Sequence, residues 1–167
     1  MNTIAEQVAT KIGANPNQMP AQIADELMVS EFDVVVNLPA SMATLFPRAE
    51  LDSLMAELPE WGPVTTIVSV AGSIFEVKAP FPRGKVGHGY YNLINKGEGL
   101  HGHLKMDNVA NVMLVSKPFM GAESHSIQFF DEAGAIVFKI YLGRDRKRVL
   151  IPEQVLRFQQ LHQAYGA

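Results

Sequence analysis

The stretch HGYYNLINKGEGLHGHLK, residues 88–105, gathers three of the five histidines and two of the four tyrosines of the chain. An aromatic-rich run at 90–94, a turn of asparagine, lysine and glycine at 95–99, and a second run after it predict a β-hairpin. Successive side chains of a strand point to opposite faces, so His101 and His103 are expected on one face, about 6.6–6.8 Å apart along the strand. Such a pair is compatible with an ordinary solvated strand. It is equally compatible with a metal or haem site, because neutral imidazole is the commonest metal ligand in proteins.

Strand patterns flank this hairpin on both sides. Runs that are β-branched or alternating, and that end in turn residues, occur at 64–70, 74–78, 109–116, 126–130 and 135–142. Between the second run and the hairpin, prolines and a glycine predict a loop at 80–85 that carries Arg83 and Lys85. We therefore expect a large antiparallel sheet built from consecutive strands.

Helical spacing of apolar residues occurs at both ends of the chain. It is found at Ile4, Val8 and Ile12, at Ile23 and Leu27, at Phe32, Val35 and Val36, over 47–58, and from Pro152 to the C-terminus. Ser30 is a predicted N-cap of the third segment, because its hydroxyl can accept a hydrogen bond from an unpaired backbone N–H. Helices, then antiparallel strands, then one helix is the pattern of an α+β fold. Since no repeat or linker divides the chain, one domain is expected over residues 1–167.

The first three helical segments resemble a helix-turn-helix, a motif that reads DNA with its last helix. Residues 1–47, however, contain Lys11 as their only basic residue, whereas their acids are Glu6, Asp25, Glu26, Glu31 and Asp33. A surface that neutralises several phosphates cannot be built from this set. We expect these helices to serve as packing architecture, and we expect no nucleic acid as a partner.

Composition favours a soluble protein that is not exported. The 167 residues suffice for a self-supporting core, and the absence of cysteine excludes disulfides, cysteine nucleophiles and Cys-ligated metal sites. The formal net charge is −3. The N-terminus lacks the basic and apolar regions of a signal peptide, and no run approaches the ~18 apolar residues of a membrane span. The sequence therefore predicts a cytoplasmic protein without a membrane partner.

Five motifs follow one another along the chain: EWGPVTT at 60–66, HGYYNL at 88–93, GHLK at 102–105, KPFMG at 117–121 and KIYLGRD at 139–145. Together they resemble the HutX/ChuX family of intracellular haem-utilisation proteins, and the resemblance covers nearly the whole chain. It implies the haem-utilisation (HemS/ChuX-like) α+β fold. It also implies a cytoplasmic carrier that holds imported haem b as cargo and delivers it to a haem-degrading or storage partner. A further implication is a homodimer that matches the tandem repeats of longer HemS-type proteins.

A haem site requires an iron ligand, an apolar floor and cations for the two propionates. His103 is the first candidate for the iron, since it lies in the GHLK motif and Gly102 leaves the neighbouring backbone open. His88 has glycine on both sides and is the second candidate. The role of His101 is open between a second ligand, a proton partner and a surface residue.

The other two histidines lie outside the hairpin. His125 is a further candidate, and Ser126 beside it stands where some family members carry a tyrosine, which argues against a tyrosinate ligand at that position. His162 lies in the predicted C-terminal helix and is interpreted as a surface residue. Candidates for the apolar floor are Phe119, Met120, Phe129 and Phe130, and candidates for the propionates are Arg83, Lys85, Lys105, Lys117 and Arg144.

Two other classes of function stay open. An enzyme would be a haem oxygenase, or a His-x-His metalloprotein in which Glu76 or Glu98 completes the coordination of one ion. An interaction module would use the N-terminal helices to dock DNA or a partner protein. No nucleophile–base pair or phosphate-binding loop supports hydrolysis or group transfer. The sequence thus favours a carrier that is not an enzyme, with haem degradation as the alternative.

Overall fold

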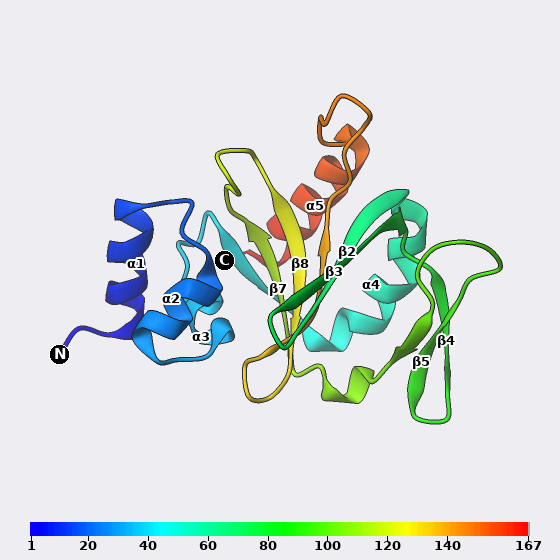
Figure 1. The fold of residues 1–167 in the computed structure, drawn as a ribbon, viewed down its shortest axis with the longest axis horizontal. Helices are drawn as coiled ribbons and strands as arrows, with labels where there is room; N and C mark the ends of the chain where they lie inside the picture. The colour runs from blue at the N-terminus through cyan, green and yellow to red at the C-terminus, as the bar shows by residue number, and fades with distance from the viewer. Residues whose placement is uncertain (167) are drawn as a thin grey trace.

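The computed structural model describes residues 1–166 (Figure 1). Its α-helices are α1 (Ile4–Ala14), α2 (Pro20–Leu27), α3 (Glu31–Val36), α4 (Leu51–Glu57) and α5 (Pro152–Tyr165), and its 3₁₀ turns are η1 (Arg48–Glu50), η2 (Leu58–Trp61) and η3 (Met106–Asn108). The strands are β1 (Ala43–Phe46), β2 (Pro63–Val70), β3 (Ser73–Pro80), β4 (Arg83–Gly87), β5 (Tyr90–Ile94), β6 (Gly102–Leu104), β7 (Asn111–Ser116), β8 (His125–Phe130) and β9 (Ile136–Tyr141). The predicted α+β class, with a large antiparallel sheet and a C-terminal helix, is confirmed.

The three N-terminal helices pack on one part of the large sheet. The predicted N-cap of α3 is confirmed, because the Ser30 hydroxyl oxygen accepts a hydrogen bond from the Asp33 N–H at 3.0 Å. The helices form an apolar cluster with the sheet residues Met113, Val115 and Phe130. Helices of 6 to 11 residues are too short to be stable alone, so this packing is what stabilises them.

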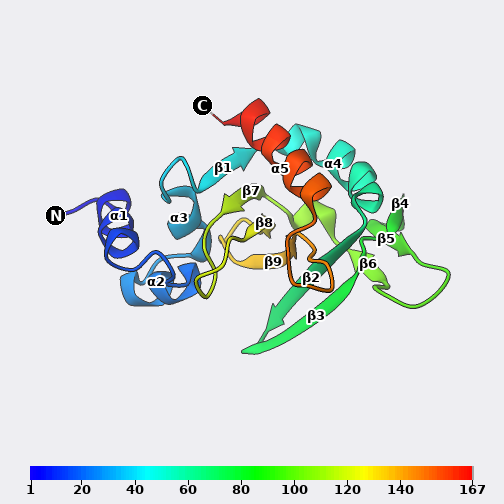
Figure 2. The same cartoon turned by 90° about the horizontal axis from the view of Figure 1, so that it is seen from above.

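The large sheet has six strands in the order β1-β7-β8-β9-β2-β3, and every pair is antiparallel (Figure 2). The sequence did not reveal β1, because its four residues are too few to show an alternating pattern. β1 is fixed by its neighbour instead, since Ala43 to Phe46 pair with Val115 to Val112 of β7.

The histidine-rich hairpin belongs to a second sheet of three strands, in the order β4-β5-β6. The loop predicted at 80–85 is wrong for its second half, because β4 begins at Arg83. Pro80 is the last residue of β3 and Pro82 precedes β4, and proline has no N–H for a strand ladder, so β3 and the pairing of the first sheet end there. The three-stranded sheet is therefore a separate unit of secondary structure.

Close packing inside this small sheet depends on one glycine. The ring of Tyr91 lies over Gly84, and a Cβ atom at residue 84 would stand 2.0 Å from the Tyr91 Cε1. Any side chain there would displace the ring, so a residue without a Cβ is required. From the sequence, Gly84 was interpreted only as part of a loop at 80–85.

The main core lies between the large sheet, helices α4 and α5, and the small sheet. Phe129 belongs to it and stacks on Phe138, with ring centroids 4.1 Å apart. Phe130 points to the other core and packs on Phe32 at 5.3 Å. Both side chains are fully buried, so the prediction that Phe129 and Phe130 form a ligand floor is wrong.

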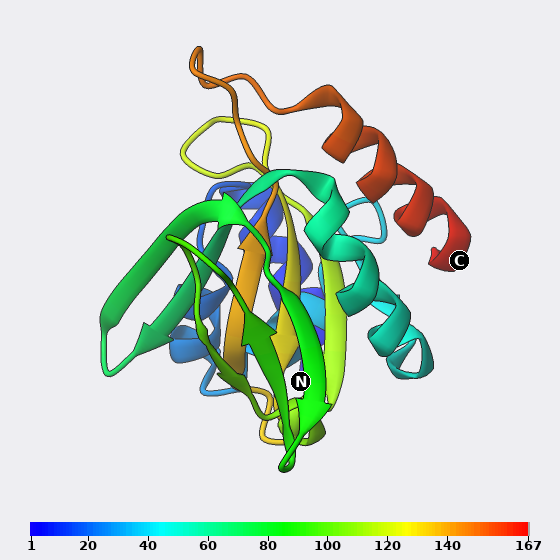
Figure 3. The same cartoon turned by 90° about the vertical axis from the view of Figure 1, so that its right-hand side faces the viewer.

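The elements are arranged along the longest axis of the molecule. The N-terminal helices lie at one end and the small sheet at the other (Figure 1), whereas α4 and α5 cover the same side of the large sheet (Figure 3). Among residues 1–166, no helix combines the length and the hydropathy of a membrane span.

Candidate functional site

The structure divides the predicted site residues between two regions. One group lies on the small sheet and its loops and consists of Arg83, His88, His101, His103 and Lys105. The other lies around the start of β8 and the segment after β9, and consists of Phe119, Met120, His125 and Arg144. Figures 1 and 2 place these regions on different parts of the molecule, so the nine residues do not form one cluster.

His103 is oriented by the neighbouring strand. It pairs with Asn92 of β5, and its Nδ1 lies 2.6 Å from the Asn92 Oδ1. The Asn92 Nδ2 donates to the carbonyls of Lys85 and Gly87 at 3.1 and 3.0 Å, which fixes the amide oxygen toward the imidazole. An oxygen can only accept, so Nδ1 carries the proton of the neutral ring and Nε2 holds the lone pair. Within residues 1–166 that Nε2 has no hydrogen-bond partner and the side chain is exposed, so its lone pair is available to an iron.

An aromatic ring packs on His103, and a lysine packs on that ring. Tyr90 meets it edge-on at 5.9 Å between ring centroids. Lys105 lies 5.0 Å above the Tyr90 ring and donates to the Gly89 carbonyl at 2.9 Å. Arg83 is less available for a propionate, because it forms an ion pair with Glu60.

Two predicted histidines of this region have other roles or positions. His88 occupies the turn between β4 and β5, exposed and with a left-handed φ of 54°. His101 precedes β6, and its Nε2 lies 2.9 Å from the Gly97 carbonyl oxygen, so the expected pair of histidines on one strand face is not formed. In the part of the chain that the structure describes, no group of three His, Asp or Glu side chains could hold a metal ion.

His125 is a packed, hydrogen-bonded residue. Its Nδ1 lies 2.8 Å from the Ser116 Oγ, its Nε2 lies 2.8 Å from the Glu123 Oε1, and its ring packs on Phe158 at 5.1 Å. Both ring nitrogens are therefore occupied, and an iron would have to displace one partner. His162 is half-buried, and its Nδ1 lies 2.6 Å from the Thr44 Oγ1, so its interpretation as a mere surface residue is wrong.

The structure also shows a polar recess that was not predicted, beside α2. It has a volume of about 20 Å³ and is lined by Met19, Pro20, Val115, Lys117, Pro118, Phe119, Ser124, Ser126, Gln128, Lys139 and Tyr141. Two pairs of facing residues, Ser126 with Tyr141 and Gln128 with Lys139, place polar side chains from β8 and β9 on the same face. The alternation of polar and apolar residues in β8 was the signal that could have revealed this face.

Several polar groups of this recess are removed from solvent. The Gln128 Oε1 is buried and, within residues 1–166, lacks a hydrogen-bond partner. Burial lowers the pKa of the Lys117 ammonium, which donates to the Pro16 carbonyl at 2.8 Å. Lys139 forms an ion pair with Glu31 of α3 at 2.7 Å. Unsatisfied and desolvated polar groups of this kind mark candidate binding sites.

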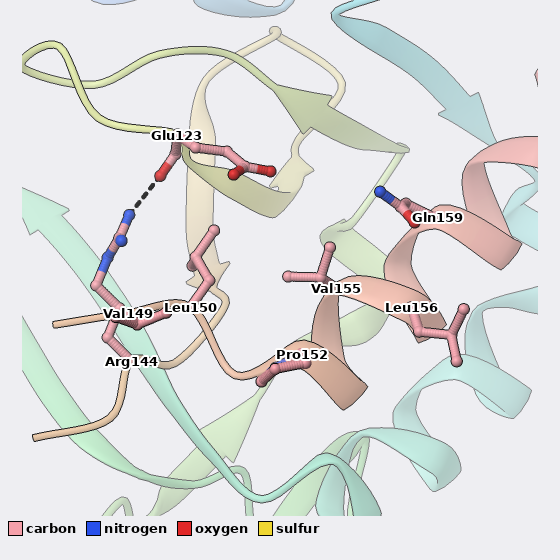
Figure 4. A pocket seen from close by; sticks show the side chains of 8 residues that line it. All are labelled: Glu123, Arg144, Val149, Leu150, Pro152, Val155, Leu156 and Gln159. Carbon is pink, nitrogen blue, oxygen red and sulfur yellow. Dashed lines mark hydrogen bonds between the residues drawn. The ribbon is translucent and has the colours of Figure 1, made fainter. Parts of the chain in front are cut away.

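A larger cavity of about 390 Å³ lies between the segment after β9 and the start of α5 (Figure 4). Its lining residues are Glu123, Arg144, Val149, Leu150, Pro152, Val155, Leu156 and Gln159. Arg144 is fixed at its edge, because the guanidinium donates to the backbone carbonyls of Glu123 and Arg148.

The predicted residues Phe119 and Met120 do not line this cavity. Both are exposed and lie in a tight turn closed by backbone hydrogen bonds between Phe119 and Ala122.

Comparisons with known proteins give one family and several relatives. The family model for haem utilisation ChuX/HutX matches residues 44–161. A protein of Vibrio cholerae serotype O1, named intracellular heme transport protein HutX, is 53% identical over 165 residues, which cover 99% of this chain and 86% of that protein. A crystal structure of an Erwinia carotovora protein is 36% identical with a TM-score of 0.88 and covers 99% of both chains. The structure of the heme binding protein ChuX is 34% identical with a TM-score of 0.84, over 97% of this chain and 98% of that one.

Proposed function

This chain belongs to the ChuX/HutX family of haem utilisation proteins, and from that membership we propose that it is a haem carrier. It holds haem b as cargo and passes it to a haem-degrading or storage partner in the cytoplasm. The observation that carries this proposal is the 53% identity, over 99% of the chain, to a protein named as an intracellular heme transporter.

We propose His103 as the iron ligand. The hydrogen bond from its Nδ1 to Asn92 supports this assignment, because it presents the lone pair of Nε2 to solvent and holds the ring in one orientation. Lys85 of β4 and Lys105, directly after β6, are the candidates for the propionates, since both are exposed and neither forms an ion pair within residues 1–166. His88 is the second candidate for the iron.

The polar recess is a second candidate location for haem in the same function. The unpaired Gln128 Oε1 and the buried Lys117 favour it, as does the exposed apolar side chain of Phe119 at its edge. At about 20 Å³ the recess must open before it can admit a porphyrin, which requires α2 to move away from the sheet. Tyr141 would then lie within the site.

A hemin titration followed by absorption spectroscopy tests the function and the location together. We expect a saturable Soret band at one haem per chain. His103→Ala should shift this band and speed haem transfer to apomyoglobin, whereas Tyr141→Phe should leave both unchanged. The opposite result assigns haem to the recess and refutes His103 as ligand. A chain that gives no Soret band refutes the carrier function itself.

We propose that the bound haem is not degraded, because no flavin or nicotinamide motif that could supply electrons is found in the sequence. Haem-loaded protein treated with ascorbate in the presence of catalase should keep its Soret band. A verdohaem or biliverdin spectrum under these conditions would establish the haem oxygenase alternative instead.

We also propose that the protein is a homodimer joined through its large sheet. β3 is an edge strand of that sheet, and exposed apolar side chains lie at and near the turn between β2 and β3: Val68, Val70, Ile74 and Phe75. An unpaired edge beside such a patch is a surface that a second copy can cover.

A further inference from the structure

A basic turn lies beside the 390 Å³ cavity. Residues 144–148, RDRKR, carry four cations and one carboxylate, whereas the whole chain has a formal net charge of −3. The turn is thus a local concentration of positive charge, with four of the 14 basic residues, on a protein that is acidic as a whole. Such a local field attracts an anionic partner and orients it before contact.

The turn is rigid before any partner arrives. The Asp145 carboxylate accepts hydrogen bonds from the backbone N–H groups of Lys147 and Val149 at 2.8 and 3.0 Å. The backbone N–H of Asp145 donates to the Val149 carbonyl at 2.8 Å, the N–H of Arg148 donates to the Asp145 carbonyl at 2.9 Å, and Arg148 adopts a left-handed φ of 65°. Both carboxylate bonds end on the Asp145 Oδ1, so the single acid of the turn shapes its backbone, and within residues 1–166 it forms no ion pair with the cations.

The cations of the turn are free to meet a partner. The side chains of Arg146, Lys147 and Arg148 are exposed and form no ion pair or hydrogen bond within residues 1–166. Arg144 is the exception, because its guanidinium is anchored to two backbone carbonyls at the edge of the cavity. A fixed turn loses little conformational entropy when its charges are paired.

The adjoining cavity adds an apolar component. Apart from Arg144 and from Glu123, whose Oε1 lies 2.8 Å from the His125 Nε2, its wall is formed by side chains of the segment after the turn and of the first turns of α5. Two of these, Val149 and Leu156, are 55% and 57% exposed. Figure 4 shows Leu150, Pro152 and Val155 between Arg144 on one side and Gln159 on the other. The volume of about 390 Å³ is sufficient for one large apolar side chain.

We propose that the basic turn and this cavity form a docking surface for an acidic segment of a partner protein. Carboxylates of the segment pair with Arg146, Lys147 and Arg148, and one apolar side chain between them enters the cavity. Exposed ion pairs contribute only about 0.2–1 kcal/mol each, so the buried apolar anchor is needed for specific binding. A nucleic-acid duplex presents no apolar side chain to the cavity, and a flat bilayer does not follow a concave wall. A protein segment is therefore the partner that the chemistry favours.

Fluorescence anisotropy with the full-length haem-free protein tests this proposal without involving either haem site. The probe is a short labelled peptide with glutamates and aspartates on both sides of one leucine. We expect saturable binding that weakens at high salt. Arg146→Glu/Lys147→Glu should weaken it about tenfold or more, which corresponds to ~1.4 kcal/mol. The charge-matched control Lys78→Glu/Lys96→Glu, at exposed positions outside the turn, should bind as the unmodified protein does.

The apolar anchor is tested separately. Replacing the leucine of the peptide by glycine, or Leu156 by glutamine, should each weaken binding severalfold without changing its salt dependence. Equal binding of the two peptides overturns the proposal, as does unchanged binding by Arg146→Glu/Lys147→Glu. Tighter binding of polyuridine RNA or of phosphatidylserine vesicles at the same salt concentration also overturns it, since the turn would then be a nucleic-acid or a membrane contact. Haem binding by the double variant should be normal, which separates this outcome from failure of the carrier function.

Discussion

The orientation of His103 depends on a single amide. The Asn92 side chain accepts from the imidazole and donates to two backbone carbonyls of the adjacent β4 strand. Groups that orient a metal ligand in this way typically contribute about 10–100-fold to metal affinity. If His103 holds the haem iron, loss of the Asn92 side chain should therefore lower haem affinity although the ligand itself is intact.

We predict that Asn92→Leu lowers haem affinity about tenfold and leaves the Soret maximum close to that of the unmodified protein. His103→Ala should move the maximum, because the ligand is lost. Apomyoglobin competition gives the affinity and the absorption spectrum reports the ligand. The control is His101→Ala, which changes a nearby exposed histidine of the loop. An unchanged affinity in Asn92→Leu would show that the amide does not position the ligand.

The buried ammonium of Lys117 makes stability depend on pH. Burial lowers its pKa in the folded protein below 10.5, so in the range between that lowered pKa and 10.5 the unfolded chain binds more protons than the folded chain. The free energy of unfolding therefore rises with pH across this range, and below it the destabilisation by the buried charge is constant.

We predict that the free energy of unfolding of the unmodified protein rises relative to that of Lys117→Met as pH increases toward 10.5, because only the unmodified protein has this buried ammonium to lose. Urea unfolding at a series of pH values measures both curves. The exposed Lys96→Met variant should show no such trend. A difference between Lys117→Met and the unmodified protein that stays constant with pH would contradict the lowered pKa.

At the scale of elements, the small sheet depends on the contact between Gly84 and Tyr91. A Cβ at residue 84 would overlap the ring, so we predict that Gly84→Ala destabilises the protein by about 1–3 kcal/mol. In a Tyr91→Ala background the same substitution should cost much less, because the ring that it meets is absent. Urea unfolding of the four proteins measures the coupling. Gly97→Ala is the matched control, since nothing lies within 4 Å of a Cβ there.

The elements that sequence analysis predicted correctly are those with their own periodicity. The α5 helix and the strand pairs β2–β3 and β7–β8 show it, and so does the capped start of α3. β1 and β4 were missed because they are short and are defined by their neighbours, which a local pattern cannot show. The split into two sheets was missed for the same reason.

Prediction of the candidate site was limited by long-range pairing. The histidines were visible as residues, but their partners Asn92, for His103, and Ser116, for His125, lie on neighbouring strands. The second partner of His125, Glu123, is only two residues away, but a local pattern does not show where its side chain points. These hydrogen bonds decide which imidazole can bind iron: His103 keeps one ring nitrogen without a partner within residues 1–166, whereas both ring nitrogens of His125 are occupied. The polar recess combines residues of α2, the segment after β7, β8 and β9, so no single stretch of sequence carries it.

At the scale of the whole molecule, the exposed tip of the β2–β3 hairpin is where we predict that two chains meet in a homodimer. Phe75 is 59% exposed and lies on the edge strand beside Ile74, which is 67% exposed. Light scattering at low micromolar concentration should give twice the chain mass of 18.4 kDa. Phe75→Glu/Ile74→Glu should give a monomer, because charged groups would enter an interface that buries on the order of 2,000 Å².

The control for this assembly is Val86→Glu, which places a charge on an apolar position outside the hairpin tip that is 75% exposed. It should remain dimeric. A monomeric unmodified protein, or a dimer that survives both substitutions in the hairpin, would show that this edge is not the interface.

The separation of the two sheets bears on how long a haem held by His103 would stay bound. The small sheet is a three-stranded unit that ends in loops, whereas every residue of β8 is buried within the large sheet. Local opening requires less free energy where fewer apolar contacts are broken, so amide protons of β5 and β6 should exchange with solvent well before those of β8. If His103 holds the iron, each such opening loosens the ligand without unfolding the rest of the molecule. The residence time of the cargo would then be set by the opening rate of one small sheet, and a receiving protein could shorten it simply by binding the opened form.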